Sequence, residues 1–402
     1  MKLFFLPLLF ILSPFLSMIV SLVMLFRKKM SENAITICLV IISMFWGVLA
    51  FSQKSLYYEG TDCTRYYSSL EFFENLNLLD TLPNIDILEM LNFVFYPVSI
   101  FVTSATGNVQ YVSFFWTSLV YFLTYISSRR LMKYYGCFSQ KKFAIVVLIS
   151  TFCFIVFVQV SELLKNSAAF AVFFYAFTLY MTKGSKLATG LWVLVSIGLH
   201  PSVIMLLPLF LYKIMNTKIL FFVSVILSLL VASTNIIEIL MNIMPGGGYF
   251  DLLMDRFGDN SKGQSGTLHY IVLQVAMLLT SLFIYFNRKA NKKEQCYAVN
   301  IIILYFLISN MNFYNLVAYL RFSILTHWQL SLLLILLIQG SINSSRISIV
   351  KKCLCIFMFI MTARWTIGRT TPGGYSSSYM NNSITNILFS TSYDYLSIDY
   401  EK

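Results

Sequence analysis

Residues 187–212 read LATGLWVLVSIGLHPSVIMLLPLFLY, an apolar stretch that is interrupted once, at His200-Pro201. An α-helix needs about 20 residues to cross the roughly 30 Å apolar core of a bilayer. Both halves are shorter than that, and proline cannot donate the helical hydrogen bond. The stretch therefore predicts a hairpin of two short helices, 187–200 and 201–212, whose apex at His200-Pro201 lies below the membrane surface.

Two further breaks resemble this one. The segments that meet at 162–166, and those around 310–321, are also short or polar at one end. Lys165, His200 and Arg321 stand at the three breaks. Irregular backbone at membrane depth is tolerated only against protein or a water-filled cavity, and a basic residue there usually marks a substrate path. We therefore expect an outward-facing cavity with these three residues at its base.

The composition excludes a soluble protein of this size, because the 402 residues are 58% hydrophobic, only 11% are charged and the mean hydropathy is +0.75. We predict an all-α polytopic membrane protein that forms a single integral membrane domain over 1–402. A stretch at about 87–103 is expected to be re-entrant or interfacial. About 12 transmembrane segments are predicted, some of them short broken helices: 3–26, 35–52, 109–127, 143–161, 167–182, 187–200, 201–212, 219–240, 269–287, 296–310, 322–338 and 353–367.

Basic residues concentrate in alternate loops, and by the positive-inside rule these loops face the cytoplasm. Both termini, the loops at about 53–108 and 241–268, and the polar tail 370–402 are then outside. The net charge of +12 is explained by membrane insertion, so no nucleic-acid partner is expected. The 19 basic residues concerned are Arg27, Lys28, Lys29, Arg129, Arg130, Lys133, Lys141, Lys142, Lys183, Lys186, Lys213, Lys218, Arg288, Lys289, Lys292, Lys293, Arg346, Lys351 and Lys352.

The first segment, 3–26, is interpreted as an anchor, because it is long and is followed by Arg27-Lys28-Lys29 without a small-residue cleavage site. Among the seven cysteines, Cys63 alone falls on the outer face. An outer disulfide within the chain is therefore not expected.

A cavity with Lys165 and Arg321 at its base suits an anionic group such as a diphosphate, since arginine offers a planar fork and lysine a mobile charge. Structural roles compete with this interpretation. Lys165 could pair with Glu162 one helical turn back. Arg321 could extend to the outer interface, and His200 could be a neutral core histidine.

The outer loop 59–67 reads EGTDCTRYY. Tyrosine faces that stack on sugar rings, beside Asp and Arg, are typical of a carbohydrate site. An interfacial aromatic belt is the competing interpretation. The second outer loop contains Pro245-Gly246-Gly247-Gly248 and Arg256, and it could cover a substrate or simply connect two spans.

Four short motifs follow one another along the chain: Asp62 with Arg65-Tyr66-Tyr67, Leu164-Lys165-Asn166-Ser167-Ala168-Ala169, Gly198-Leu199-His200-Pro201-Ser202 and Tyr319-Leu320-Arg321-Phe322. In this order and spacing, they resemble the EpsG-like branch of the Wzy-type polysaccharide polymerases over roughly 35–340. That family usually has arginine where this chain has Lys165, so the charge is kept and the bidentate fork is lost.

The resemblance implies a glycosyltransferase that joins oligosaccharide repeat units carried on undecaprenyl diphosphate, at the outer face of a bacterial inner membrane. Arg321 and Lys165 would stabilise the departing diphosphate. His200 is the first candidate for the base that activates the acceptor hydroxyl, and Asp62 is the second. The substrate-binding candidates are Arg65, Tyr66, Tyr67, Asn166 and Arg256.

The implied partners are the undecaprenyl-diphosphate-linked oligosaccharide, the lipid bilayer, and flippase and chain-length regulator proteins. No cofactor or metal is expected, because the sequence has no clustered ligand set and no phosphate-binding loop. A flippase, a glycan ligase and a lipid-linked monosaccharide transferase stay open as alternatives. The last of these often carries an acidic pair in its first outer loop, and Asp62 has no adjacent acid.

Overall fold

A computed structural model describes residues 5–27, 30–54, 62–71, 92–155, 157–233, 293–311, 378–379 and 391–396, together with the isolated positions 275, 278, 279, 282, 285, 322 and 335. The regular secondary structure of these residues is helical apart from one antiparallel pair of two-residue strands, β1 (Gln53–Lys54) and β2 (Ser378–Tyr379). The predicted helical architecture is confirmed. The chain divides into two compact units, Met1–Val203 with Ile349–Lys402, and Ile204–Ser348.

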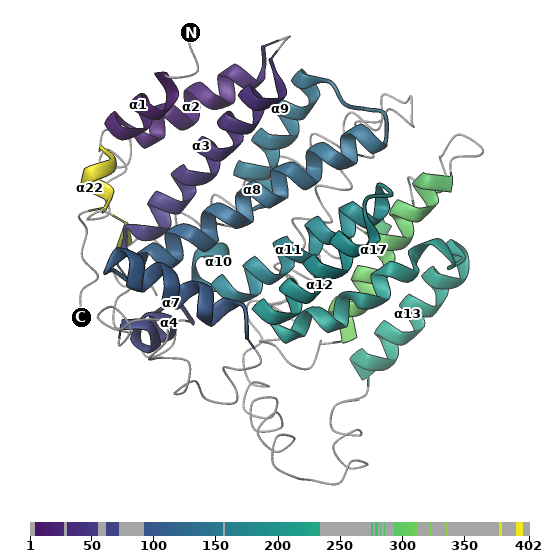
Figure 1. The fold of residues 1–402 in the computed structure, drawn as a ribbon. Helices are drawn as coiled ribbons and strands as arrows, with labels where there is room; N and C mark the ends of the chain where they lie inside the picture. The colour runs from purple at the N-terminus through teal and green to yellow at the C-terminus, as the bar shows by residue number, and fades with distance from the viewer. Residues whose placement is uncertain are drawn as a thin grey trace. The chain divides into compact units, whose positions relative to one another are not determined.

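The first unit is organised around one long helix, α8 (Gln110–Tyr134). This helix packs against α3 (Glu32–Phe51) and against α11 (Leu164–Met181), and α12 (Lys186–Leu199) packs in turn on α11 (Figure 1). The contact between α3 and α8 is close at Gly47, where an added Cβ would lie 2.6 Å from the carbonyl oxygen of Phe114. Small residues permit such close helix packing.

The continuous span predicted for 3–26 is wrong. The chain forms α1 (Phe5–Leu12) and α2 (Pro14–Leu25), separated by Ser13 in an extended conformation. The hydroxyl of Ser17 donates to the carbonyl oxygen of Leu6 at 3.0 Å. In a straight helix these residues would lie about 16 Å apart along the axis. Therefore α1 folds back on α2.

The single span predicted for 143–161 is also wrong. It consists of α9 (Gln140–Ile149), a π-helical turn η2 (Ser150–Phe154), and α10 (Phe157–Glu162). The N–H of Ile155 donates to the carbonyl oxygen of Ser150, five residues back, at 2.9 Å. Single π-helical turns occur often at functional positions. In the chain, this one lies between the candidate motifs at 62–67 and 164–169.

Two short helices occupy regions that the sequence assigned to outer loops and to a re-entrant segment. The helix α4 (Asp62–Glu71) forms within the first outer loop, and α7 (Phe95–Thr106) forms in the stretch predicted to be re-entrant. A helix of 12 residues is about 18 Å long, which is too short to cross a bilayer. Gly107 ends α7 in the left-handed conformation, with φ of 66°, just before α8 begins.

The described part of the tail 370–402 packs on the N-terminal helices. Strand β2 pairs with β1 at the end of α3, and α22 (Ser392–Leu396) contacts α1 and α3. The hydroxyl of Ser392 donates to the carbonyl oxygen of Phe10 at 2.6 Å.

The second unit contains α13 (Thr217–Ser233) packed on α17 (Lys293–Met311), and most of η3 (Pro201–Lys213), a 3₁₀-helix. The end of η3 is held by Asn300 of α17. The amide of Asn300 donates to the carbonyl oxygens of Tyr212 and Met215 at 2.9 and 2.8 Å, which satisfies groups left open at a helix end.

Among the described residues, α3 is the one helix long and apolar enough to cross a membrane by itself. The predicted number of about 12 segments is therefore not established. Most of 269–287, 322–338 and 353–367 lies outside the described residues. Six shorter apolar helices are described: Pro14–Leu25, Phe95–Thr106, Lys186–Leu199, Pro201–Lys213, Thr217–Leu230 and Cys296–Met311.

Candidate functional site

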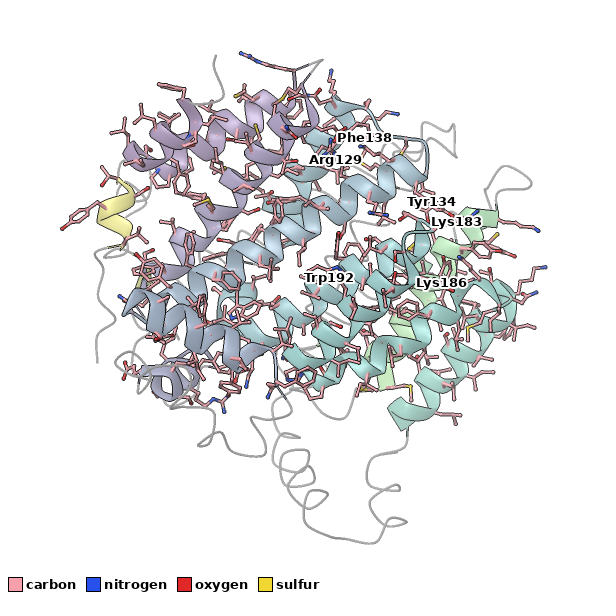
Figure 2. All side chains as sticks on the ribbon, viewed as in Figure 1. Arg129, Tyr134, Phe138, Lys183, Lys186 and Trp192 are labelled. Atoms are coloured by element: carbon pink, nitrogen blue, oxygen red, sulfur yellow. The ribbon has the colours of Figure 1, made fainter. Side chains whose placement is uncertain are left out.

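Three segments of the first unit that were predicted to face the cytoplasm meet at one end of that unit. Arg129 of α8 pairs with Glu32 at the start of α3, and Lys133 donates to the same carboxylate at 3.1 Å. Arg130 donates through Nε to the hydroxyl of Thr182, after α11, at 2.6 Å. Figure 2 labels Arg129 near Phe138, Lys183 of the turn after α11 near Tyr134, and Lys186, the first residue of α12. We call this end, defined by Arg129, Arg130, Lys133, Lys183 and Lys186, the basic end.

The other ends of the same helices form a second region. The amide of Gln110, at the start of α8, donates to the carbonyl oxygen of Phe51, at the end of α3, at 2.8 Å. Helix α4 attaches to the same part of α8, because the hydroxyls of Tyr67 and Ser113 share a hydrogen bond of 2.5 Å. We call this region, defined by α4, α7 and the first turn of α11, the site end.

The start of α7 lies inside the unit and not at its rim. The ring of Phe95 stacks on Trp116 with 5.3 Å between centroids, and the indole N–H of Trp116 donates to the hydroxyl of Ser99 at 2.9 Å. Trp116 is six residues from the beginning of α8, which corresponds to about 9 Å along the helix. Helix α7 therefore begins at this depth and runs back toward the level at which α8 begins, and it ends at Gly107, three residues before Gln110.

Lys165 lies in the first turn of α11, directly after the helix start at Leu163-Leu164, and this start falls within the break predicted for 162–166. Its ammonium nitrogen lies 4.6 Å from the ring centroid of Tyr66 and 4.9 Å from that of Tyr96. The same nitrogen donates to the hydroxyl of Tyr96 at 3.2 Å. The side chain of Lys165 therefore points toward α4 and α7, within the unit.

The four candidate residues of α4 face three directions. Asp62 is buried and pairs with Arg65, whose side chain is 61% exposed. Tyr66 faces Lys165, whereas Tyr67 is fully buried against α8. Arg65 is thus exposed, Tyr66 lies buried against Lys165, and Tyr67 packs the helix against its neighbour.

Cys63 lies on α4 next to Asp62, and the charge of Glu162 of α10 also acts on its thiol. Burial, followed by the charges of Glu162 and Asp62, raises the pKa of its thiol to about 11, although hydrogen bonds from Ser113 and Tyr67 oppose this shift. The thiol is free and stays protonated at neutral pH. It is therefore poorly suited to act as a nucleophile.

His200 occupies the predicted break between α12 and η3, which is confirmed. The backbone N–H of Ser202 donates to Nδ1 of His200 at 3.2 Å, so the imidazole caps the start of η3 with Pro201 in the first position. Nδ1 also lies 2.7 Å from the hydroxyl of Ser202, and the neutral tautomer that lets Nδ1 accept the hydrogen bond from the backbone N–H carries its proton on Nε2. In this tautomer Nε2 donates a hydrogen bond and cannot accept one.

Two features bring His200 and Lys165 into one neighbourhood. The N–H of Val94 donates to the carbonyl oxygen of Gly198 at 2.9 Å, and the next residue along the chain, Phe95, contacts Lys165. In addition, α11 and α12 are packed around the turn at 182–185. Residues equally distant from such a turn are level, which places His200 roughly beside Ser167, within one helical turn of Lys165.

Asn166 is 4% exposed, and its side-chain oxygen accepts no hydrogen bond from the part of the chain that the structure describes. The other two predicted site residues, Arg256 and Arg321, lie outside the described residues. Within the described ranges, no group of three His, Cys, Asp or Glu residues could hold a metal ion. The sequence did not single out Phe95 or Tyr96, because their proximity to Lys165 depends on tertiary packing.

Comparison with known families assigns the chain. The sequence profile of the EpsG family matches residues 55–381, which is well over half of the protein. The protein belongs to the EpsG family. This family assignment places it among membrane proteins of polysaccharide biosynthesis, and it confirms the resemblance seen in the four motifs. Neither the curated proteins nor the solved structures contain a significant match.

Proposed function

We propose that this EpsG-family protein polymerises oligosaccharide repeat units carried on undecaprenyl diphosphate, at the outer face of a bacterial inner membrane. The observation that supports this most directly is the Lys165 ammonium, which is held inside the unit at a helix break, against Tyr66 of α4 and Tyr96 of α7. A fixed cation in a site of low dielectric favours a reaction in which negative charge builds on a leaving group. A diphosphate is such a leaving group.

In the proposed reaction a sugar hydroxyl of one lipid-linked glycan attacks the anomeric carbon of the sugar attached to the diphosphate of another. The bond between that carbon and the phosphate oxygen breaks, and undecaprenyl diphosphate leaves with the bonding electrons. Lys165 and Arg321 stabilise its charge. Arg65, Tyr66, Asn166 and Arg256 are the proposed contacts for glycan or phosphate, whereas the fully buried Tyr67 supports them by holding α4 against α8.

The tautomer of His200 refines its proposed role. An imidazole with its proton on Nε2 suits hydrogen-bond donation to a diphosphate oxygen better than removal of a proton. Asp62 then takes the proton that the acceptor hydroxyl loses. The product passes to the chain-length regulator, and the substrate arrives through the flippase, both of which are proposed partners.

The test replaces the chromosomal copy by Lys165→Ala, Arg321→Ala or His200→Ala and separates the surface glycan on a gel. Lys142→Ala is the matched control, because Lys142 is an exposed lysine at the start of α9, among the loops of the basic end. At normal protein levels, we expect single repeat units from the three site variants and a full ladder from the control. Loss of all external glycan indicates a flippase, and full ladders from all three site variants contradict the proposed site.

A further inference from the structure

Three aromatic rings surround the ammonium of Lys165. Tyr66 of α4 and Tyr96 of α7 lie 4.6 and 4.9 Å from the nitrogen, and Phe95 of α7 lies 5.7 Å from it. All three distances are within the range in which the negative face of a ring attracts a cation. We call Tyr66, Phe95 and Tyr96 the aromatic cage.

The cage is itself held by α8. Phe95 stacks on Trp116, which is fixed by its hydrogen bond to Ser99. Tyr66 is carried by α4, which the hydrogen bond between Tyr67 and Ser113 attaches to α8. Tyr66 also packs on Phe95, with 5.5 Å between ring centroids. The rings therefore form a fixed set of walls against which the lysine side chain rests.

A lysine needs such walls more than an arginine does. Its ammonium is a point charge on a flexible four-carbon chain, with no planar fork to set its direction. An electrostatic contact accelerates a reaction most when it is already in place before charge develops. The hydrogen bond from Lys165 to Tyr96 adds a direction that ring faces alone do not supply.

We propose that Tyr66, Phe95 and Tyr96 are positioning residues that hold the Lys165 ammonium in the place where it meets the diphosphate of the substrate. This inference rests on the proposed function and adds to it the means by which a lysine serves in this position. It assigns a role to the start of α7, which the sequence marked only as a re-entrant segment.

The kinetic consequence is specific. Loss of an interaction that is made only in the transition state lowers kcat and kcat/KM by the same factor and leaves KM unchanged. We expect Tyr66→Leu and Tyr96→Leu each to lower kcat by about 3- to 30-fold, the factor that corresponds to one cation–π contact. Tyr66→Phe keeps the ring and should lose less kcat than Tyr66→Leu. Tyr96→Phe keeps the ring but loses the hydrogen bond, and its kcat should lie between that of Tyr96→Leu and that of the wild type.

The experiment has two readouts on the full-length protein in nanodiscs. The first is the rate at which an amine-reactive ester modifies Lys165, measured by mass spectrometry with Lys142 as the internal reference. The cage should slow this modification, so Tyr66→Leu and Tyr96→Leu should accelerate it while Lys142 is unaffected. The second is polymer formation from lipid-linked repeat units extracted from cells that lack this protein.

The outcomes separate the two proposals. Faster modification of Lys165 with a lower kcat and rescue by Tyr66→Phe supports the positioning role. Faster modification with wild-type kcat overturns the positioning role and leaves the proposed function intact. Unchanged modification overturns the cage. A wild-type rate from Lys165→Ala contradicts the proposed use of this lysine, whatever the cage does. Thermal unfolding and size-exclusion profiles identify variants that fail to fold. If a leucine variant fails to fold, Tyr66→Phe and Tyr96→Phe provide the test of the positioning role.

Discussion

The two ends of the first unit hold positive charge in different ways. At the basic end, Arg129 and Lys133 share the carboxylate of Glu32, which is largely exposed to solvent. At the site end, the ammonium of Lys165 lies among ring faces inside the unit. Ring faces attract a cation, and burial among them keeps it away from bulk water. The comparison shows that the basic end pairs its charges with a carboxylate at the surface, whereas the site end holds a lysine against buried rings.

The largest expected effect tests the difference between the two ends directly. Lys165→Ala should lower polymer formation by about 10²- to 10³-fold, as does loss of one group that stabilises a developing negative charge. Lys133→Ala should change the rate less than twofold, because an exposed ion pair contributes about 0–1 kcal/mol to stability. Polymer formation in nanodiscs measures both. Equal losses from the two variants would remove the distinction between the ends.

The second prediction concerns the close approach of α12 to the segment before α7. An added Cβ at Gly198 would lie 2.6 Å from side-chain atoms of Phe93 and Val94, whereas at Gly190, on the same helix, it meets nothing within 4 Å. Gly198→Ala should cost about 1–3 kcal/mol of stability through overpacking and should lower activity. Gly190→Ala should be neutral or stabilising by up to about 1 kcal/mol. Thermal unfolding of the two variants provides the comparison.

The third prediction separates the two roles of His200. Asparagine is a good N-cap, so His200→Asn should keep most of the stability, while His200→Ala should lose about 1 kcal/mol. Both variants lack the Nε2 donor and should lose activity to a similar extent. An active Asn variant would show that capping is the whole contribution of this residue.

The smallest expected effect concerns Cys63, whose pKa is raised by burial from 9.0 to about 11. The folded protein then holds this proton more tightly than the unfolded chain, so the contribution to stability is complete below pH 9 and is lost as pH rises toward 11. Maleimide should label Cys63 slowly at pH 7–9. Cys63→Ser should remove this component of the pH dependence of unfolding. Rapid labelling at pH 7 would contradict the burial of α4 against α8.

The breaks could be predicted from the sequence because their signals are local. Pro201 lacks an N–H, which ends α12 at Leu199, and polar residues at 162–166 mark the start of α11. Ser13-Pro14 carried the signature of a helix start, Ser at the cap and Pro in the first turn, and the long apolar run of 3–26 obscured it. The sequence thus contained enough to divide this segment.

Other features depend on contacts between distant residues. The π-helical turn at Ser150–Phe154 has no local signal in the sequence. Phe95 and Tyr96 are two among many aromatic residues, and their position beside Lys165 results from the packing of α7 on α8. The polar residues of α4 favour a loop in a sequence-based prediction. The structure shows a helix there, with Tyr67 and Leu70 fully buried on its other face.

The pairing of β2 with β1, and the bond from Ser392 to Phe10, affect the biogenesis of the protein. The ribosome releases residues 10 and 53–54 long before residues 378–392 exist. These two contacts therefore form only after nearly the whole chain has been synthesised. A fusion tag placed directly after residue 396 would interfere with the formation of these contacts. A chain shortened before residue 378 would lack both of them.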